Sequence, residues 1–565
     1  MKQARAAPTV IATDRASYLS SGSDAPGHIF IDLRSPQTDG RSSDGALRDG
    51  PAPIYTSPEV VGVLAQYAAI GLLYGAIPNL LFPLFTGYFH MSGSQYNSGK
   101  ALIGIGWSLK VFVGMLSDCV PIFGRRRKFW MILGWLACLG CMVVLATIDM
   151  GLPYYPTADL AARKNLTLPE KAMLNADAPE KGGVVGLLLG LATLAYIFAD
   201  VPADALVVEI AQREPIDVRG RMQTLVYATR TVFSSFSVAI IAIGLNSFKF
   251  SGSFDWDMGI HTIFILLGIV CASMVPVTLL FIHDQYHPGF HFGEYLHRFW
   301  HVIQKRATWQ VMIFNFLFNF LSSGITSTAA PYVMKHWAKA DNLNYQVLNL
   351  ASGFLFAMGL SALGKWGMLW NWRYVLVLTT ISGNMIDAVV QFTTIYDVIR
   401  DQWWYLGVPL AENLPFSMQF IVTTFIIVEL AEEGSEGIMY GLMTTVSNMP
   451  SVLGPVVANA IFSKFDVSED DIKADSRHVR DQVAYTYVIY YGTTLLACLC
   501  VGLLPNQKID LQHMLRYGGK SATMGGLALG FCFLVLAYSV SVSILGMFAS
   551  TSCLRIAGGD GCNAV

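Results

Sequence analysis

The chain of 565 residues is 53% hydrophobic and only 13% charged, and it contains 51 glycines. This composition suits a polytopic helical membrane bundle, in which small residues allow close helix contact, and it argues against a soluble domain. The net charge of −2 does not indicate nucleic acid as a partner. Nine cysteines are scattered without the paired spacing of a zinc site or a disulfide framework, so we expect no metal and no cofactor.

The first 57 residues are rich in Ser, Gly, Asp and Pro and show almost no apolar periodicity. Such a segment cannot bury enough apolar surface to fold. We therefore predict a disordered tail over residues 1–57, with no signal peptide ahead of the first span.

About thirteen apolar stretches follow, each long enough to cross the hydrocarbon core of a bilayer as a helix. They lie at about 61–86, 98–118, 128–148, 183–207, 223–245, 260–282, 309–333, 346–368, 373–396, 404–430, 438–462, 484–504 and 524–549. A weak match between residues 219–229 and 436–446 falls at the start of spans five and eleven, as expected for two repeated halves.

These spans predict an all-α integral membrane protein of two six-helix halves with an extra C-terminal transmembrane helix. The expected divisions are an N-terminal half at 58–282, a cytosolic linker at 283–307, a C-terminal half at 308–504, and the extra helix with its tail at 505–565.

A polar break between spans two and three carries Asp118 and the basic run Arg125–Lys128. Lys and Arg near span ends stay in the cytosol, so this run predicts a cytosolic loop and a cytosolic N-terminus. A cluster of this kind can bridge neighbouring helices and latch one conformation. The gate candidates are Gly114, Asp118, Arg125 and Arg126. Arg127 and Lys128 are interpreted as simple anchors at the membrane surface.

The triplet Asn165-Leu166-Thr167 is a glycosylation acceptor in the connection between spans three and four. The predicted topology puts this connection on the outer side. Asn165 and the long polar tail together favour a eukaryotic plasma membrane as the location.

Charged side chains inside the spans of the first half are candidates for a substrate site, because a charge at mid-bilayer is costly unless paired or hydrated. Lys110 shares a helical face with Trp107 on span two, and Asp200 and Asp204 are four residues apart on span four. Arg230 on span five is a natural partner for one of these aspartates.

The second half adds Asp387 on span nine and Glu412 with Phe416 on span ten. The alternative for each charge is structural, because an ion pair can simply lock two helices, and an aromatic ring at helical spacing is more often core packing. Glu209 and Glu429 lie near span ends and are interpreted as interfacial.

Together these residues carry a family resemblance. The run GMLSDCVPIFGRRRK is similar to the signature loop of the major facilitator superfamily, with a slightly longer Asp-to-Gly spacing. More specifically, the chain resembles the folate-biopterin transporter family over roughly residues 59–504. The residues that carry this second resemblance are Trp107-Ser108-Leu109-Lys110, Gly114, Ser117-Asp118, Pro121-Ile122, Gly124-Arg125-Arg126, Asp200, Asp204, Glu214-Pro215, Arg219-Gly220 and Gln223.

The resemblance implies a major-facilitator-type bundle that moves folate or biopterin-type pteridines by alternating access, and a raised proton affinity of the paired aspartates would make it proton-coupled. The expected partners are the small-molecule substrate, protons and the lipid bilayer, with no nucleic acid and no indicated oligomeric state. No nucleotide-binding loop and no nucleophile with a base partner stand out, so we expect no enzyme. The alternatives are a transporter of the same fold for S-adenosylmethionine, a nucleoside or an amino acid, and a membrane receptor that transports nothing.

Overall fold

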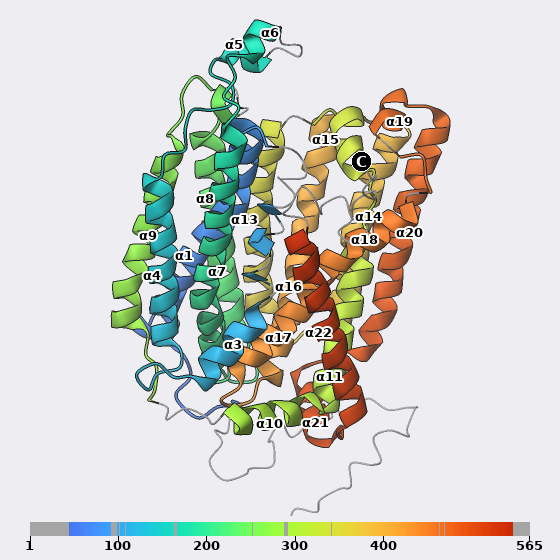
Figure 1. Ribbon diagram of the computed structural model, residues 1–565. Helices are drawn as coiled ribbons and strands as arrows, with labels where there is room; N and C mark the ends of the chain where they lie inside the picture. Colours follow the sequence, from blue (N-terminus) through green and yellow to red (C-terminus); the bar gives the residue numbers. More distant parts are fainter. Residues whose placement is uncertain are drawn as a thin grey trace, which may run out of the picture.

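The computed structural model describes residues 45–545 except 92–98, 101, 105, 108, 163–166, 251, 253, 287–291, 341, 463 and 468. Long helices make up most of this part of the chain, and they lie side by side with their axes roughly parallel (Figure 1).

The first half is a group of helices that begins with a well-capped segment. The Ser57 side chain accepts a hydrogen bond from the N–H of Val60, and Pro58 fills the first turn, where a missing N–H costs little. The helices of this half are α1 (Pro58–Leu81) continued by η2 (Phe82–Tyr88), α3 (Lys110–Cys119), α4 (Lys128–Thr147), α7 (Ala178–Ala211), α8 (Arg221–Gly244) and α9 (Ile260–Phe281).

The second half repeats the arrangement with more breaks. Its helices are α11 (Arg306–Asn319) with η4 (Phe320–Gly324), α12 (Ala330–Tyr332) with η5 (Val333–Trp337), α13 (Asn342–Trp366), α14 (Trp372–Ile395), α15 (Gln402–Gly407), η6 (Val408–Glu412), α16 (Asn413–Leu430), α17 (Glu436–Asn448), α18 (Pro450–Phe462) and α20 (Arg477–Cys500) with η7 (Val501–Leu503). The break between α17 and α18 comes at Pro450, which has no N–H to continue the helical ladder.

Short elements mark the two ends of the bundle in Figure 1. We call one end the linker end, because α10 (Phe292–Ile303), which connects the halves, lies there beside α21 (Lys508–Tyr517). The short helices α5 (Ala158–Ala162) and α6 (Leu168–Lys171) lie at the opposite end, as does α19 (Glu469–Ala474). The 3-10 turn η3 (Phe248–Phe250) connects α8 to α9.

In the part of the chain described above, nine helices are long and apolar enough to cross a membrane. They coincide with predicted spans one, three to six, eight to ten and twelve. Spans two, seven and eleven are also helical where described, but each is interrupted, because Leu109 is a turn just before α3, η4 ends α11, and Pro450 divides span eleven. Span thirteen is a helix of 24 residues.

The predicted extra helix is α22 (Ala522–Leu545), and it packs against α10, α11 and α18. Its start is tied to the linker by a hydrogen bond from the Ser521 N–H to the Gln304 carbonyl, 2.8 Å long. Gly525 lets the two backbones meet, because a Cβ there would lie 3.1 Å from the carbonyl oxygen of Ile303. The extra helix is therefore attached to the connection between the halves.

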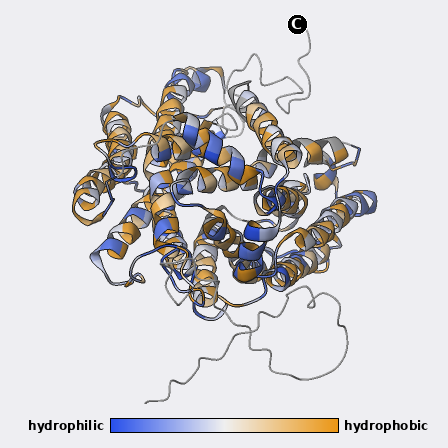
Figure 2. Cartoon of the chain, turned by 90° about the horizontal axis from the view of Figure 1, so that it is seen from below, coloured by the Kyte–Doolittle hydropathy of each residue, from blue (hydrophilic) through white to orange (hydrophobic). Residues whose placement is uncertain are grey.

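Apolar side chains cover the outer faces of the bundle. Leu187, Ile269 and Leu378 are 54%, 60% and 69% exposed on three different helices. Figure 2, seen along the helices from the linker end, shows apolar colour on most of the peripheral helices. Exposed apolar surface on this scale fits contact with lipid rather than with water.

The two halves touch at the linker end where α3 crosses α17. A Cβ at Gly114 would lie 2.2 Å from the carbonyl oxygen of Gly437, closer than atoms can pack. A Cβ at Gly441 would lie 2.8 Å from the carbonyl oxygen of Lys110. The absence of side chains at these positions lets the two backbones meet.

We expect Gly114→Ala to lower the free energy of unfolding by about 1–3 kcal/mol, because the new methyl group overpacks this crossing. Thermal unfolding of the purified full chain in detergent measures the effect. Gly140→Ala is the matched control, since nothing lies within 4 Å of a Cβ there and alanine favours the interior of α4. Equal stabilities of the two variants would contradict the assigned contact.

Candidate functional site

The Lys110 side chain is buried between two aspartates of α7. Its Nζ is 2.5 Å from Asp200 and 2.9 Å from Asp204, which are four residues apart on α7 and so share one face. All three side chains are at most 3% exposed. The sequence-predicted residues of spans two and four therefore meet directly, and their summed charge is negative when both aspartates are ionised.

A tyrosine completes this cluster. The Tyr67 hydroxyl on α1 donates a hydrogen bond to Asp204 Oδ1, while Asp204 Oδ2 faces Lys110. Asp200 Oδ1 is buried without a hydrogen-bond partner among the described residues. Sequence reasoning missed Tyr67, because a lone tyrosine in an apolar span gives no sign of which helix it faces.

Aromatic rings surround the cationic side chains. The Lys110 Nζ lies 4.7 Å from the ring centre of Trp107, which meets Tyr74 edge to face at 5.4 Å. Arg230 lies against two rings, with its guanidinium carbon 5.0 Å from Tyr74 and 4.5 Å from Tyr227. The predicted ion pair between Arg230 and an aspartate of span four is thus replaced by the pairs that Lys110 makes.

The candidates of the second half form a separate group. Asp387 on α14 accepts hydrogen bonds from Gln391 at 3.0 Å and from the Tyr491 hydroxyl at 2.8 Å. Glu412 at the end of η6 is 9% exposed, and its Oε1 is buried without a hydrogen-bond partner in the described chain. Within that same part of the chain, no hydrogen bond or ion pair joins this group to Lys110.

Aromatic contacts cross the space between the two groups. Phe420 on α16 meets Tyr227 of the first half edge to face, with ring centres 5.1 Å apart. Phe416, one turn earlier, packs against α14, where a Cβ at Gly383 would lie 2.8 Å from its ring. Phe416 therefore packs against a neighbouring helix, as its helical spacing indicated.

At the linker end, Asp118 joins the two halves. Its carboxylate is fully buried and accepts hydrogen bonds from the N–H groups of Gly437 and Ile438, at 3.3 and 2.8 Å, at the start of α17. The Tyr295 hydroxyl of α10 also donates to Asp118, at 2.8 Å. A carboxylate at a helix N-terminus satisfies free N–H groups and meets the positive end of the helix dipole. Asp118 thus caps a helix of the opposite half.

Arg127 is the cation of this cluster, which corrects its interpretation as a surface anchor. It is fully buried and pairs with Asp118, with Glu209 at 3.0 Å and with Glu436 at 3.1 Å. Glu209 was expected to be interfacial, but its side chain is 18% exposed and held in this network. Glu436 had no assigned role.

A tight turn decides which arginine of the run points inward. Ile122 and Arg125 exchange backbone hydrogen bonds of 3.0 Å across Phe123 and Gly124, which have φ of 50° and 73°. Two central residues with positive φ are the mark of a type I′ turn. After this turn Arg127 faces the gate, whereas Arg125 donates to the backbone carbonyl of Asp284.

The gate candidate Arg126 lies at the edge of the same network, 4.0 Å from Glu209. Lys128 donates to the backbone carbonyl of Leu279 at 2.6 Å. Neither residue reaches Asp118 in a hydrogen bond or ion pair of the described chain.

The segment just before α1 lies across the gate, although we predicted disorder up to residue 57. The N–H groups of Leu47 and Arg48 donate to the carbonyl of Gln212 at 2.9 and 3.1 Å. The Arg48 guanidinium lies 2.8 Å from Glu436 and 3.6 Å from Glu433, both of the second half. These contacts hold residues 45–57 in place, and nothing in the sequence composition indicated them.

A second ion pair between the halves lies beside the first. Arg219 of the first half is 2.5 Å from Glu429, which is 2% exposed rather than interfacial. Gln512 of α21 donates to Glu429 Oε2 at 2.8 Å, and Lys508 donates to the carbonyl of Ile216 at 3.2 Å. The helix that follows α20 therefore contacts both halves.

Glu214 organises the turn that carries Arg219. It accepts hydrogen bonds from the Tyr55 hydroxyl and from the N–H groups of Gly220 and Met222, at 2.8, 2.7 and 2.9 Å. Burial raises the pKa of Glu214 to about 7, although these hydrogen bonds favour its charged form.

The glycosylation candidate Asn165 lies outside the described residues.

Sequence comparisons support the family resemblance. The model of the BT1 family matches residues 73–158. A protein named folate-biopterin transporter from Synechocystis sp. is 23% identical over 420 residues, which are 72% of this chain and 74% of the relative. A protein named folate transporter 1 from Plasmodium falciparum is 33% identical over 60 residues, 11% of this chain and 12% of the relative.

Solved structures confirm the predicted fold. A proton:xylose symporter of the major facilitator superfamily bound to 6-bromo-6-deoxy-D-glucose superposes with a TM-score of 0.55 and 12% identity, over 82% of this chain and 100% of the symporter. A D-xylose-proton symporter superposes with a TM-score of 0.52 and 12% identity, over 79% and 98% of the two chains. The chain is thus a multi-pass membrane protein with the major facilitator fold.

We expect Arg127→Gln to loosen the linker end, because it leaves the buried Asp118 carboxylate without its cation at a cost of about 3–5 kcal/mol, whereas Glu436 keeps Arg48. Cys119 is a native reporter, being 6% exposed beside Asp118. Its modification by a thiol reagent should be at least about tenfold faster in Arg127→Gln than in the parent, with Cys119→Ser identifying the labelled thiol. Arg125→Gln is the matched control, and equal labelling rates in both variants would contradict this role of Arg127.

We expect Glu214 to make stability fall with rising pH. A carboxyl whose pKa is higher in the folded chain binds protons more tightly when folded, so the free energy of unfolding decreases from about pH 4.5 to about 7, by about 3 kcal/mol at most. Melting temperatures at pH 5 and pH 8 measure this slope, and Glu214→Gln should flatten it. Asp257→Asn should retain the slope, because bonds from Ser247 and Lys249 lower the pKa of Asp257 against the effect of its burial. An unchanged slope in Glu214→Gln would refute the assignment.

Proposed function

Because the chain resembles the folate-biopterin transporter family and has the major facilitator fold, we propose that it is a secondary-active transporter of folate- or biopterin-type pteridines. The observation that carries the proposal is the buried cluster of Lys110, Asp200 and Asp204 beside aromatic rings, in a bundle of two halves. Charges held inside a membrane bundle favour a site for a polar solute over pure packing. The activity is transport, and no reaction is assigned to the chain.

The chemistry of a pteridine fits this cluster. A pterin ring presents an amino group beside a ring N–H, and a carboxylate can accept both. Asp200 Oδ1, which has no partner among the described residues, is the proposed acceptor. Trp107, half-buried beside Lys110, offers a face for stacking on the flat ring.

The second half would complete the site from the opposite side. Glu412 Oε1 lacks a partner in the described chain, and Asp387 is held by Gln391 and Tyr491. We propose that these two carboxylates and Phe416 line the path of the substrate.

Folate also carries a glutamate tail with two negative charges, and this tail requires a cation. Lys110 is already neutralised by two aspartates, whereas Arg230 has no carboxylate within 4 Å among the described residues. Tyr74, which stacks on Arg230, is 41% exposed, so the arginine is held near an accessible surface. We therefore assign the tail to Arg230 and the pterin edge to the aspartates.

Alternating access would require the linker end to open. Opening would separate Gly114 from Gly437 and would break the bonds from Asp118 and Arg127 to α17 and Glu436. Arg125 and Arg126 would act with this gate from its edge. The basic loop at this end favours the cytosol for the linker end and for the N-terminus, with the plasma membrane of a eukaryote as the proposed location.

The charge of the central cluster supports the proposal of proton coupling. Two aspartates and one lysine leave one uncompensated negative charge in a buried site, which is costly in a medium of low dielectric constant. A proton taken up with the substrate would cancel this charge. We propose Asp200 and Asp204 as the pair that carries it.

A second candidate is a transporter of the same fold for a cationic solute of the S-adenosylmethionine type. It is favoured by the acidic excess, because Asp200, Asp204, Asp387 and Glu412 outnumber Lys110 and Arg230. Competition separates the candidates, since only a pteridine transporter would lose labelled-folate uptake to unlabelled biopterin and keep it with S-adenosylmethionine.

We expect Lys110→Ala and Asp204→Asn each to reduce uptake of radiolabelled folate at least about tenfold. Lys110→Ala leaves two buried aspartates without their cation, and Asp204→Asn removes one of the carboxylates assigned to the pterin edge and to the proton. Uptake into vesicles is normalised to the amount of inserted protein. Lys249→Ala is the control, because Lys249 is 40% exposed and pairs with Asp257 in a connecting loop. Unchanged uptake in both site variants would refute the assigned site.

We also expect an inward-directed proton gradient to accelerate uptake of labelled folate into vesicles of the parent, and Asp204→Asn to lose this acceleration. If the rate of folate uptake does not change with the imposed proton gradient, proton coupling is excluded and facilitated diffusion is the remaining mechanism.

A further inference from the structure

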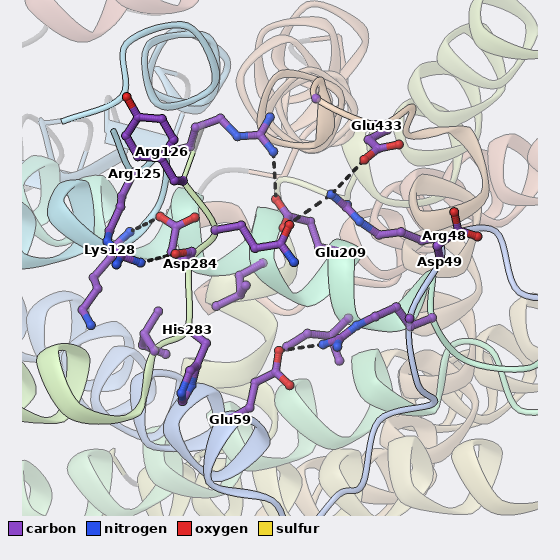
Figure 3. Close-up of a pocket in the computed structure, with 18 of the residues that line it drawn as sticks. Arg48, Asp49, Glu59, Arg125, Arg126, Lys128, Glu209, His283, Asp284 and Glu433 are labelled. Carbon is purple, nitrogen blue, oxygen red and sulfur yellow. Dashed lines mark hydrogen bonds and ion pairs between the residues drawn. The ribbon is translucent and has the colours of Figure 1, made fainter. Parts of the chain in front are cut away.

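A cavity of about 960 Å³ opens at the linker end, away from the central cluster. Figure 3 shows that basic and acidic side chains from several elements point into it. From its lining we infer that this cavity binds a phosphate-bearing anion, and that the headgroup of an anionic membrane lipid is its favoured source.

Among the described residues, two cations of the cavity lining, Arg48 and Arg213, are paired with carboxylates, but others are not. Arg125 and Lys128 donate to backbone carbonyls, and neither has a carboxylate within 4 Å in an ion pair of the described residues. Arg126 is 7% exposed and lies 4.0 Å from Glu209, and its Nη1 is buried without a hydrogen-bond partner in the described chain. A buried guanidinium with a free N–H group is a built donor for a phosphate oxygen.

Four of the five acids that line the cavity already have partners, among them Glu433, which lies 3.6 Å from Arg48. Glu59 pairs with Arg213 at 2.6 Å, and Glu209 pairs with Arg127 at 3.0 Å. Asp284 accepts the backbone N–H groups of Arg127 and Lys128 at 2.7 and 3.0 Å. Six cations and five acids line the cavity, so the formal net charge of its lining is +1.

The cavity rim also favours a lipid. Leu279 and Leu280, in the last turn of the membrane-crossing helix α9, line it and are 48% and 72% exposed. Exposed leucines beside arginines at the end of a membrane helix offer apolar contact for acyl chains below a headgroup. A free phosphate would use the arginines alone.

An anion in the cavity would lie beside a contact between the halves, because Arg48 of the lining pairs with Glu433 and Glu436 of the second half. Glu209 of the first half, Glu433 of the second half and Arg48 of the preceding segment all line the same cavity. A bound anion would thus favour the arrangement in which the linker end is closed, by binding that state better than an opened one.

The test measures the melting temperature of the purified full chain in detergent with added phosphatidic acid, phosphatidylcholine or inorganic phosphate. We expect phosphatidic acid to raise it by about 3 °C or more and phosphatidylcholine to leave it unchanged. Arg126→Gln and Lys128→Gln should abolish the rise, and Arg126→Lys should retain part of it. Lys181→Gln, whose lysine pairs with Asp149 at the opposite end, should keep the full rise.

If inorganic phosphate also raises the melting temperature, and the same variants lose this rise, the result would support the site and show that free phosphate can occupy it. A rise with phosphatidic acid alone would support the lipid. No rise with either anion, or an equal rise in Arg126→Gln and Lys128→Gln, would overturn the inference.

Discussion

The contact on which the linker end depends is the carboxylate of Asp118 at the start of α17. Asp118 belongs to one half and the N–H groups of Gly437 and Ile438 to the other, and the carboxylate is fully buried. Burying a charge is tolerated only where hydrogen bonds and an opposite charge replace water. Arg127 supplies that charge and also pairs with Glu436. The helix cap at Asp118 is therefore part of a network of buried ion pairs.

A carboxylate caps the corresponding helix in each half, but it comes from a different place. The start of α8 is capped by Glu214 from its own half, whereas the start of α17 is capped across the interface by Asp118. Arg219 reaches from the first half to Glu429, and Glu436, its counterpart in the weak repeat, reaches from the second half to Arg127. The repeated position therefore joins the halves in both copies while its charge is reversed.

Helix α3 connects the central cluster to this network. Lys110 begins the helix and Asp118 lies near its end, about 12 Å apart at the rise of an α-helix. The charges that Lys110 meets on α7 and the helix that Asp118 caps on α17 lie on either side of this one rigid element. Gly114, between the two residues, keeps α3 against α17.

Hydropathy, charge placement and local motifs were sufficient to predict the helical spans and the fold, because each depends on residues close together in the chain. They also brought out Lys110, Asp200 and Asp204, since charges inside apolar spans are conspicuous in any arrangement. Tertiary structure alone decided the partners. Which arginine of the run faces inward follows from the turn at Phe123 and Gly124, and the burial of Glu429 and the contacts of Arg48 require surfaces distant in sequence to meet. Arg230 stacks on rings instead of pairing because Lys110, from another helix, reaches the aspartates. Such choices depend on helix rotation and on contacts between halves, which periodicity along one segment does not encode.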